Sequence, residues 1–459
     1  MTNVRKLTVV LLWLAGSSCL SAQNASNMSQ ADSLPAQWDL QTCIEYALQQ
    51  NITIRKNRLS AESATVDVKS AKAALFPSLS ANVSQRIVNR PNSDVNTIID
   101  GDNITSSSSK TSYNGSYGID ANWTLYNGGK RLNSLKQQQL NNRIAELNVA
   151  ESENSIEESI AQIYVQILYA SEAVKINEAT LEVSQAECER AKELFAAGSI
   201  AKSDLAQLEA QVSTDKYQLV TAEATLQDYK LQLKQLLELD GEEEMNLYIP
   251  VLGDENVLLP LPAKSDVYRA ALLLRPEIEA GKLDVEAADL DIKIARAGYI
   301  PTLSLSAGIG TTNSNGNDFT FGEQVKQNWN NSLGFTISIP IFSNRQNKSA
   351  VEKAKIQKLT SELSLLDEQK ALYKTIENLW LDANSAQQQY AAAVEKLKST
   401  QISYELIQEQ FNLGMKNTVE LLTEKNNLLN AQQETLQAKY MAILNMQLLK
   451  FYQGDDLKL

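Results

Sequence analysis

The side chains that most often carry enzyme or metal chemistry are sparse in this sequence. It contains no histidine, which removes the commonest general base, the usual partner of serine and cysteine nucleophiles, and the commonest metal ligand. The acidic run 242–244 could bind a cation, but it follows Gly241 after a helix-forming tract and lacks spaced partner ligands. We interpret it as a solvated loop. We therefore expect no enzyme activity, no metal site and no cofactor.

Three cysteines remain as candidate reactive groups. Cys43 and Cys188 lie far apart in two helix-forming tracts, and because a disulfide needs close Cα atoms, we expect two small buried thiols. Cys19 falls in residues 1–22, where a basic pair, an apolar run and small residues are typical of a signal peptide, with cleavage after Ala22. A lipoprotein modified at Cys19 and a buried first helix are the alternatives.

Composition limits the partners and favours helices. The formal net charge is −13 at pH 7, so phosphate would repel the chain and we expect no nucleic-acid partner. With 18 Gly and 9 Pro in 459 residues, the bias is toward long helices rather than compact, loop-rich domains. No apolar run after the predicted signal peptide approaches the ~20 residues of a membrane helix.

Two stretches interrupt helix-forming tracts in the same way. FAAGSIAKSDL begins at Phe195 and FNLGMKNTVEL begins at Phe411. Other junctions repeat as well, with LFPSLSANVS at Leu75 matching YIPTLSLSAG at Tyr299. Such self-similarity indicates an internal duplication. We predict two copies of one structural unit.

Four segments alternate apolar and polar residues. They are 76–90, 113–127, 301–311 and 329–342. This period predicts strands with one apolar face, and their lengths approach the ~9–11 residues that cross a bilayer, with polar loops between them. A half-buried sheet of a soluble sandwich is the alternative. Because membrane barrels begin at about eight strands, four per chain predict association.

The remaining tracts have the spacing of coiled coils. Residues that recur every seven positions in one tract are Leu205, Val212, Leu219, Leu226 and Leu233. Such repeats form helix-to-helix seams. The tract 129–197 would be ~100 Å long, and the shorter tracts 40–74 and 203–239, stacked end to end, would match it. An ordinary soluble bundle is the alternative, but it would not explain strands inserted at equivalent points of both copies.

The order helix, strand, strand, long helix, glycine turn, helix, given twice behind a signal peptide, resembles the TolC-type outer-membrane efflux proteins. The resemblance runs from Trp38 to about Tyr452, through the FPSLS and IPTLS junctions, LYNGGKR, LRPEIEAGKLDVEAADLDIKIARAGYIPTLSLSAG and two F-x-x-G turns. It implies a mainly α fold with membrane β: a homotrimer whose twelve-stranded outer-membrane β-barrel, four strands per chain, continues into a periplasmic α-helical coiled-coil barrel.

On this resemblance the chain divides into five parts. These are a signal peptide (1–22), a first repeat with its tip turn at 198–202 (23–239), an equatorial linker (240–265), a second repeat with its tip turn at 413–417 (266–452) and a C-terminal tail (453–459). The linker and the chain ends would form a belt midway along the helices.

The resemblance implies a passive exit duct of a tripartite efflux or secretion system. It would span the outer membrane of a Gram-negative bacterium, extend into the periplasm, and work with a periplasmic adaptor and an inner-membrane transporter of RND or ABC type. Drugs, metal ions and polypeptides all remain open as cargo. The alternatives are a periplasmic adaptor, which has one hairpin, and a trimeric adhesin, which would place all four strands at the C-terminus.

The same resemblance implies a closed gate and docking tips at the helix turns. The gate residues carried over from the family are Ser203, Asp204, Phe411, Lys416 and Glu420. The turns implied to dock the adaptor contain Gly198, Ser199, Ile200, Gly414 and Met415. Lys416 would hold Ser203 and Asp204 across neighbouring hairpins. Three Glu420 side chains would form an acidic ring, although solvated surface charges are the plainer interpretation.

The sequence departs from the family pattern at two gate positions. Phe411 stands where a hydrogen-bonding tyrosine is found, so the matching bond to Asp204 cannot form. Thr423 replaces a second acidic residue. Glu424 is adjacent, but one helical step of ~100° directs it elsewhere.

Overall fold

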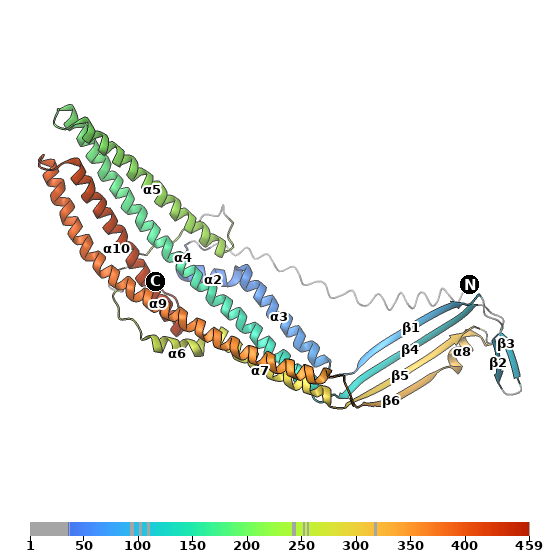
Figure 1. The fold of residues 1–459 in the computed structure, drawn as a ribbon. Helices are drawn as coiled ribbons and strands as arrows, with labels where there is room; N and C mark the ends of the chain where they lie inside the picture. The colour runs from blue at the N-terminus through green and yellow to red at the C-terminus, as the bar shows by residue number, and fades with distance from the viewer. Residues whose placement is uncertain are drawn as a thin grey trace.

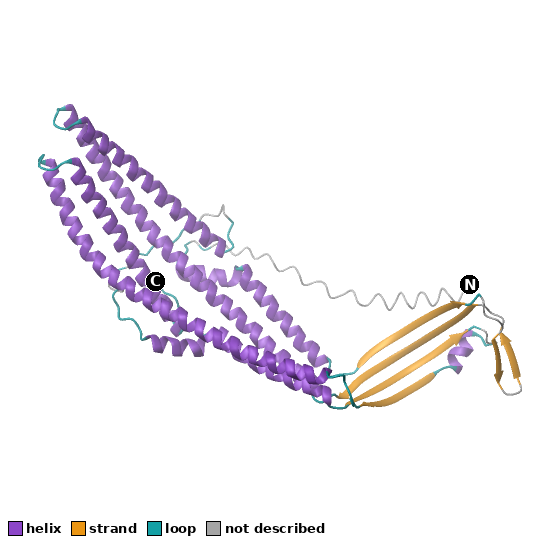
Figure 2. Ribbon diagram, viewed as in Figure 1, coloured by secondary structure: helices purple, strands orange, loops and turns teal. Residues whose placement is uncertain are grey.

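The computed structural model describes residues 35, 37–91, 96–100, 103–107, 111–240, 245–250, 253–254, 257–315 and 319–458. Within this part the molecule is elongated, with long helices at one end and a sheet at the other (Figure 1). Helices and strands are segregated along the long axis (Figure 2). The predicted signal peptide at 1–22 and the acidic run 242–244 lie outside the described residues.

Two long helices run through the helical part and turn back at its far end. α4 (Lys130–Ala196) and α9 (Gln346–Asn412) have 67 residues each, or about 100 Å at 1.5 Å per residue. Each is followed by a shorter antiparallel helix, α5 (Lys202–Leu236) and α10 (Thr418–Gln453). The chain therefore forms two hairpins whose tips lie farthest from the sheet (Figure 1).

The core lies in the seams between these helices. Leu233 of α5, which belongs to the predicted heptad repeat, is buried, as are Ile160 and Ile167 of α4. Cys43 and Cys188 are free and buried, as predicted. Among the described helices none combines the length and apolarity needed to cross a membrane.

Each hairpin is extended toward the sheet by one helix, α3 (Ile52–Ala73) or α7 (Pro276–Arg296), which follows a shorter helix, α2 (Leu40–Gln50) or α6 (Lys264–Leu274), after a single break (Figure 1). Asn51 leaves the helical conformation and its side chain accepts hydrogen bonds from the first turn of α3, as N-cap residues do. At the second break, Pro276 disfavours helical dihedrals at Arg275. The continuous tracts predicted across these two residues are therefore wrong.

The two breaks occupy equivalent positions in the two repeats. The number of residues from Asn51 to Arg275 equals that from Pro77 to Pro301, the prolines of the matching FPSLS and IPTLS junctions. At each break short helices meet end to end, as predicted. The Asn51 Nδ2 donates to the carbonyl oxygen of Leu236 at the end of α5, at 3.0 Å.

At the second break, the Arg275 guanidinium lies 3.8 Å from the centroid of the Tyr452 ring at the end of α10. Arg275 also pairs with Glu158 of α4. Beside α4, the helices α3 and α5 therefore take the place of one long helix. Beside α9, α7 and α10 do the same.

Four antiparallel strands form one sheet in the order β1-β4-β5-β6. They are β1 (Ser78–Asn89), β4 (Thr111–Tyr126), β5 (Thr302–Ser314) and β6 (Asn330–Ser338). The register aligns Ala81 with Ile119 and Ile119 with Ile309, and it aligns Leu305 with Phe335. Because side chains alternate between faces, most apolar residues of the four strands share one face, and most Ser, Asn, Gly and Thr residues share the other. Near the end farthest from the helices, Thr311 and Asn313 lie on the apolar face as well.

The strand ends and loops differ from the prediction in detail. β6 stops at Ser338, short of the predicted 342, because Pro340 has no N–H group for the ladder. β5 instead continues past 311 to Ser314. The segments expected to be loops contain further elements, namely β2 (Asn96–Asp100), β3 (Asn103–Ser107) and helix α8 (Phe321–Gln327).

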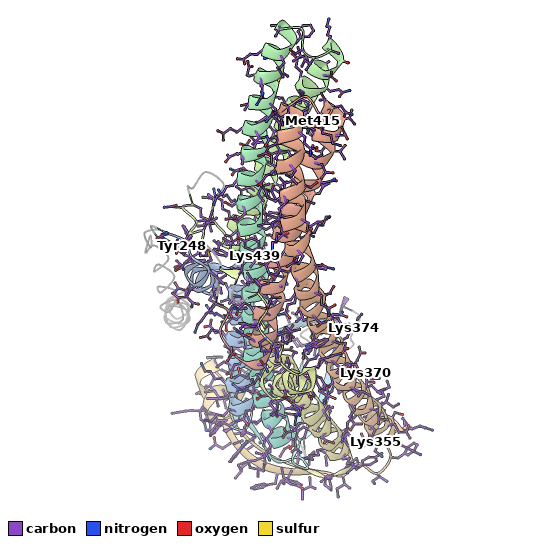
Figure 3. All side chains as sticks on the ribbon, turned by 90° about the vertical axis from the view of Figure 1, so that its left-hand side faces the viewer. Tyr248, Lys355, Lys370, Lys374, Met415 and Lys439 are labelled. Carbon is purple, nitrogen blue, oxygen red and sulfur yellow. The ribbon has the colours of Figure 1, made fainter. Side chains whose placement is uncertain are left out.

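The segment that follows α5 packs across the middle of the helical part. Trp38 forms a parallel bridge with Leu247, and the Tyr248 amide donates to the Trp38 carbonyl oxygen at 2.8 Å. Lys439 of α10 pairs with Asp254 at 2.7 Å, and Tyr248 and Lys439 are both seen midway along the helices (Figure 3). These contacts bring the linker and the N-terminal part of the described chain to one level.

Candidate gate and a buried charge cluster near the hairpin tips

The two tip turns have the same backbone geometry. Gly198 and Gly414 have φ angles of 73° and 71°, in the left-handed region that other L-residues occupy only at a cost. The Ser199 amide donates to the Leu194 carbonyl oxygen, and the Met415 amide donates to the carbonyl oxygen of residue 410, each at 2.8 Å. These are the bonds of a Schellman motif, so each glycine ends a long helix and reverses the chain. Met415 projects at the end of its hairpin (Figure 3).

The helix that follows each tip is capped by one of the predicted gate acids. Asp204 Oδ2 accepts a hydrogen bond from the Ala201 amide at 3.3 Å. Glu420 Oε2 accepts one from the Asn417 amide at 3.2 Å, and the Asn417 side chain accepts one from the Glu420 amide at 2.9 Å. The second arrangement is a reciprocal cap of two orphan amides. Both acids therefore stabilise the starts of their own helices.

Within one chain, Lys416 contacts Glu420. The Lys416 Nζ lies 2.6 Å from Glu420 Oε1, while Ser203 and Asp204 lie in the first turn of α5, on the other hairpin. A contact of Lys416 with Ser203 and Asp204 therefore needs a neighbouring hairpin, as the family pattern implies. The Lys416 ammonium, followed by the Asn417 amide, lowers the pKa of Glu420.

The side chains of Phe411, Thr423 and Glu424, beside the predicted gate, all contact their own hairpin. Phe411 packs at the edge of a small apolar cluster that contains Tyr404 and Leu421. Glu424 points toward α9, where its carboxylate accepts a hydrogen bond from Ser403 at 3.0 Å. The Thr423 hydroxyl donates to a backbone carbonyl of its own helix. Neither Thr423 nor Glu424 thus supplies a second acid beside Glu420.

A buried charge cluster, which the sequence analysis did not identify, lies between the two hairpins a few turns from the tips. Its charged members are Glu187 of α4, Asp215 of α5 and Lys425 of α10, whose side chains are 11%, 1% and 5% exposed. Ser184 of α4 and Tyr404 of α9 complete it. All four long helices therefore contribute to one polar centre.

The Lys425 ammonium has three polar neighbours, and it donates hydrogen bonds to two of them, Glu187 and the Ser184 hydroxyl. Its Nζ lies 3.2 Å from Glu187 Oε2 and 3.6 Å from Asp215 Oδ2, and it donates to the Ser184 hydroxyl, which in turn donates to Asp215. A buried ammonium is tolerated when its charge is paired and hydrogen-bonded. The lysine thus joins the second hairpin to both helices of the first.

The charge cluster has two carboxylates and one ammonium, and each carboxylate also accepts a hydrogen bond from a neutral side chain. The Tyr404 hydroxyl donates to Glu187 Oε1 at 2.9 Å, and the amide of Gln211 donates to Asp215 Oδ1 at 2.8 Å. Burial, and then the charge of Glu187, raise the pKa of Tyr404, so its hydroxyl keeps its proton. The cluster is hydrogen-bonded on every side, which is the condition under which buried charges specify a unique arrangement.

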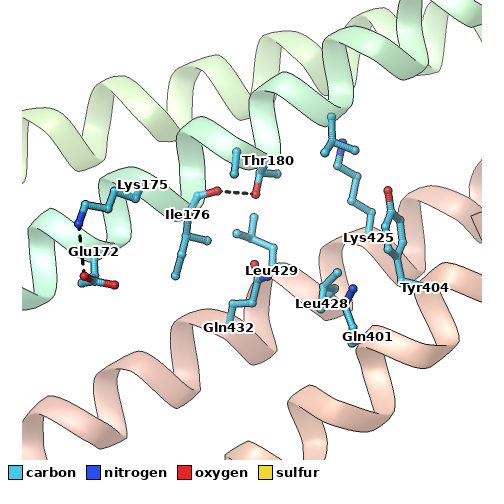
Figure 4. A pocket seen from close by; sticks show the side chains of 12 residues that line it. Glu172, Lys175, Ile176, Thr180, Gln401, Tyr404, Lys425, Leu428, Leu429 and Gln432 are labelled. Atoms are coloured by element: carbon cyan, nitrogen blue, oxygen red, sulfur yellow. Dashed lines mark hydrogen bonds and ion pairs between the residues drawn. The ribbon is translucent and has the colours of Figure 1, made fainter. Parts of the chain in front are cut away.

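A groove with mixed polar and apolar lining continues from the charge cluster along the seam between the hairpins. Ile176 and Thr180 of α4 line it from one side, and Leu428 and Leu429 of α10 line it from the other. Lys425 lies near the Tyr404 end of this groove (Figure 4). Apart from the charge cluster, the contact between hairpins therefore includes ordinary apolar packing.

The sequence does contain a signal for the charge cluster. Asp215 follows buried Leu208 by one heptad, and Lys425 lies one helical turn after buried Leu421. Each position belongs to a seam that calls for an apolar side chain. Polar residues in a seam point to a buried partner, but the spacing alone does not say which residue that partner is.

Comparison with known sequences settles which family has this architecture. The sequence model described as "Outer membrane efflux protein" matches residues 43–238 and 267–454. The chain belongs to the outer membrane efflux protein family. The predicted resemblance is confirmed, and the chain is an outer-membrane transport protein rather than an enzyme.

Members of the outer membrane efflux protein family resemble the chain over nearly its full length. The outer membrane protein TolC of Salmonella enteritidis is 22% identical over 98% of this chain and 87% of its own. The solved structure of CusC has a TM-score of 0.77 at 20% identity, covering 90% of this chain and 91% of that one. The Campylobacter jejuni CmeC outer membrane channel has a TM-score of 0.76 at 18% identity, covering 92% and 87%.

Membership of the outer membrane efflux protein family confirms the predicted TolC-like fold and the location in the outer membrane of a Gram-negative cell. The alternatives of a periplasmic adaptor and a trimeric adhesin are set aside. The chain has two hairpins, and its sheet takes two strands from each half of the sequence.

Proposed function

We propose that three copies of the chain form one continuous exit duct from the periplasm to the cell exterior. The observation that carries this proposal is the sheet. Among the described strands, β1 pairs with β4 and β6 pairs with β5, which leaves one edge of each outer strand without a partner. One face of this sheet is apolar over most of its length, from the helical end to Ile119 and Ile309. Hydrocarbon does not tolerate unpaired strand edges, so β1 of one copy would pair with β6 of the next.

Three copies supply twelve strands, which exceeds the minimum of about eight for a membrane barrel. The polar face, rich in Ser, Asn and Gly, would line the lumen. The purified protein in detergent is expected to be a trimer by native mass spectrometry. A monomer that forms no pores in planar bilayers would contradict the proposal.

The helical end of the duct would meet a periplasmic adaptor and, through it, an inner-membrane transporter. The turns with Gly198, Ser199, Ile200, Gly414 and Met415 are the parts of the described chain farthest from the sheet (Figure 1). A photo-crosslinking residue in place of exposed Met415 is expected to capture the adaptor in intact cells. Identification of the transporter that co-purifies would separate an RND from an ABC partner and narrow the cargo class.

We further propose that the tips form the gate. Lys416 would reach Ser203 and Asp204 of a neighbouring hairpin, and the three Glu420 carboxylates would form an acidic ring in the lumen. Such a ring favours cations over anions. Phe411 would add apolar packing where the family pattern has a hydrogen bond.

The Glu420 ring predicts the ion preference of the channel and its dependence on pH. Glu420→Gln channels in planar bilayers are expected to lose most of their cation preference at pH 7. Within one chain, Lys416 and the Asn417 amide lower the pKa of Glu420, whereas neighbouring carboxylates in a ring raise one another's pKa. The wild-type preference should be present at pH 7 and should disappear as the pH falls and Glu420 is protonated. Within one chain, the contribution of this carboxylate to the stability of the helix start is lost as the pH falls through the lowered pKa.

Glu424→Gln is the matched control, since Glu424 lies on the same helix but points toward α9. It is expected to leave the ion preference unchanged. An unchanged preference in Glu420→Gln would remove this residue from the constriction.

A further inference from the structure

The apolar face of the sheet changes character toward the end that is farthest from the helices. Ile309 and Ile119 lie opposite each other in the aliphatic part. One step further along the same face, Tyr117 lies opposite Thr311, and the Tyr117 hydroxyl donates to Gln85 at 3.2 Å. Membrane strands show this change from aliphatic to aromatic and polar side chains where hydrocarbon gives way to headgroups.

Helix α8 lies on this margin, on the apolar side of the sheet. The Phe321 ring meets the Tyr117 ring edge-on, with centroids 6.2 Å apart. The Thr311 hydroxyl donates to the Val325 carbonyl oxygen at 2.9 Å. Tyr117 and Thr311 both belong to the face that carries the aliphatic residues. The helix therefore covers the outward side of β4 and β5 and does not extend the lumen.

Side-chain hydrogen bonds fix α8 to the end of β5. Gln324 is buried, accepts from the Ser314 amide at 2.8 Å and donates to the Phe319 carbonyl oxygen at 2.9 Å. Asn328 donates to the Thr312 carbonyl oxygen at 2.7 Å. A helix of 7 residues has little stability of its own. These bonds hold it in one position relative to the sheet.

The same segment exposes three large aromatic side chains. Phe319 is 50% exposed, Phe321 is 50% exposed and Trp329 is 56% exposed. They lie within a few residues of one another, immediately before, within and after α8. A group of exposed aromatic residues on a rigid support usually marks an interaction surface.

We propose that α8 and its three aromatic residues lie at the boundary between headgroups and acyl chains in the outer leaflet of the membrane. The occupant of this surface is lipid, because the surface adjoins the aliphatic part of the same face of the sheet at Ile119 and Ile309, which the proposed barrel turns toward the membrane. Aromatic rings are preferred at this depth, since they combine an apolar body with a polarisable or hydrogen-bonding edge. The segment fixes the height of the sheet in the bilayer from outside the barrel wall.

The inference is tested by measuring the depth of single labelled positions in lipid vesicles. Phe321→Cys protein is labelled with a maleimide fluorophore and reconstituted into phosphatidylcholine vesicles whose acyl chains carry a nitroxide near the headgroup. Cys43 and Cys188 do not interfere, because both are buried and burial raises the pKa of Cys43 to about 12. Cys19 lies in the predicted signal peptide and is expected to be removed with it. Most of the fluorescence from position 321 is expected to be quenched, as is that from a label on Trp329→Cys.

Two control positions make every outcome informative. A label on Leu333→Cys, on the aliphatic part of β6, is expected to be quenched by nitroxides placed deeper in the acyl chains. A label on exposed Lys326→Cys, turned ~140° from Phe321 around α8, is expected to keep most of its fluorescence. If Leu333 is quenched and Phe321 is not, the aromatic surface faces water or a neighbouring copy and the inference is wrong. Loss of quenching at Leu333 would instead overturn the membrane placement of the sheet.

Discussion

Replacing Lys425 with methionine is expected to lower the free energy of unfolding of the helical part by about 3–5 kcal/mol, the usual effect of removing one partner of a buried ion pair. The methionine fills a similar volume but leaves the Asp215 and Glu187 carboxylates buried without their cation. Urea denaturation followed by far-UV circular dichroism measures the loss. The same variant should show a higher resting conductance in planar bilayers, because the contact that joins the two hairpins is weakened close to the proposed gate.

The double variant Lys425→Met with Asp215→Asn is expected to recover a large part of this loss, since one of the stranded charges is removed as well. Lys396→Met is the matched control. Lys396 pairs with Glu434 between α9 and α10 at 2.7 Å, but both side chains are about half exposed. Exposed pairs contribute little, so the control should unfold like the wild type. Equal effects of Lys425→Met and Lys396→Met would show that the buried cluster does not hold the hairpins together.

Two neighbouring substitutions in β6 are expected to have opposite effects. Phe335 lies on the apolar face of the sheet and Thr336 lies on the polar face. Phe335→Arg should oppose insertion by about 2–4 kcal/mol, the range for an arginine placed near the middle of the lipid face of a barrel. Thr336→Arg should insert normally and change the conductance, because its side chain would enter the lumen.

The fraction of each variant that folds into phospholipid vesicles measures this difference, and single-channel recordings report the effect in the lumen. Equal insertion of the two variants would mean that the apolar face does not meet lipid. Ser332→Arg, on the polar face and opposite Gly308, is a second control that should behave like Thr336→Arg.

The sequence was sufficient for the parts of the fold that repeat with a short period. Alternation over residues such as Leu303, Leu305 and Ala307 predicted strands with an apolar face, and the heptad spacing from Leu205 to Leu233 predicted the coiled coils. These patterns are strong because one face of each element must meet a different environment from the other. The equivalence of Gly198 and Gly414 predicted both tips, since a left-handed residue after a long helix calls for glycine.

Features that depend on one residue and its partner were not predicted. Asn51 sits in a helix-forming tract, and only the hydrogen bonds to α3 and to Leu236 reveal that it ends one helix and begins the next. Asp215 and Lys425 are separated by nearly half of the chain, so their pairing becomes evident only when the two hairpins lie side by side. Helix α8 was taken as loop because its amphipathic pattern is too short to exceed the background of a polar segment.

The uninterrupted α4 and α9, each beside a pair of short helices that meet at Asn51 or Arg275, make every column stiff along one side and jointed along the other. A rod of about 100 Å with an unbroken backbone ladder tilts as a whole when its end is pushed sideways. The neighbouring side gives way first where that ladder is interrupted, at the level of the two joints. A sideways push at the tips is therefore carried by α4 and α9 along their whole length, while the bending that it requires is concentrated at Asn51 and Arg275.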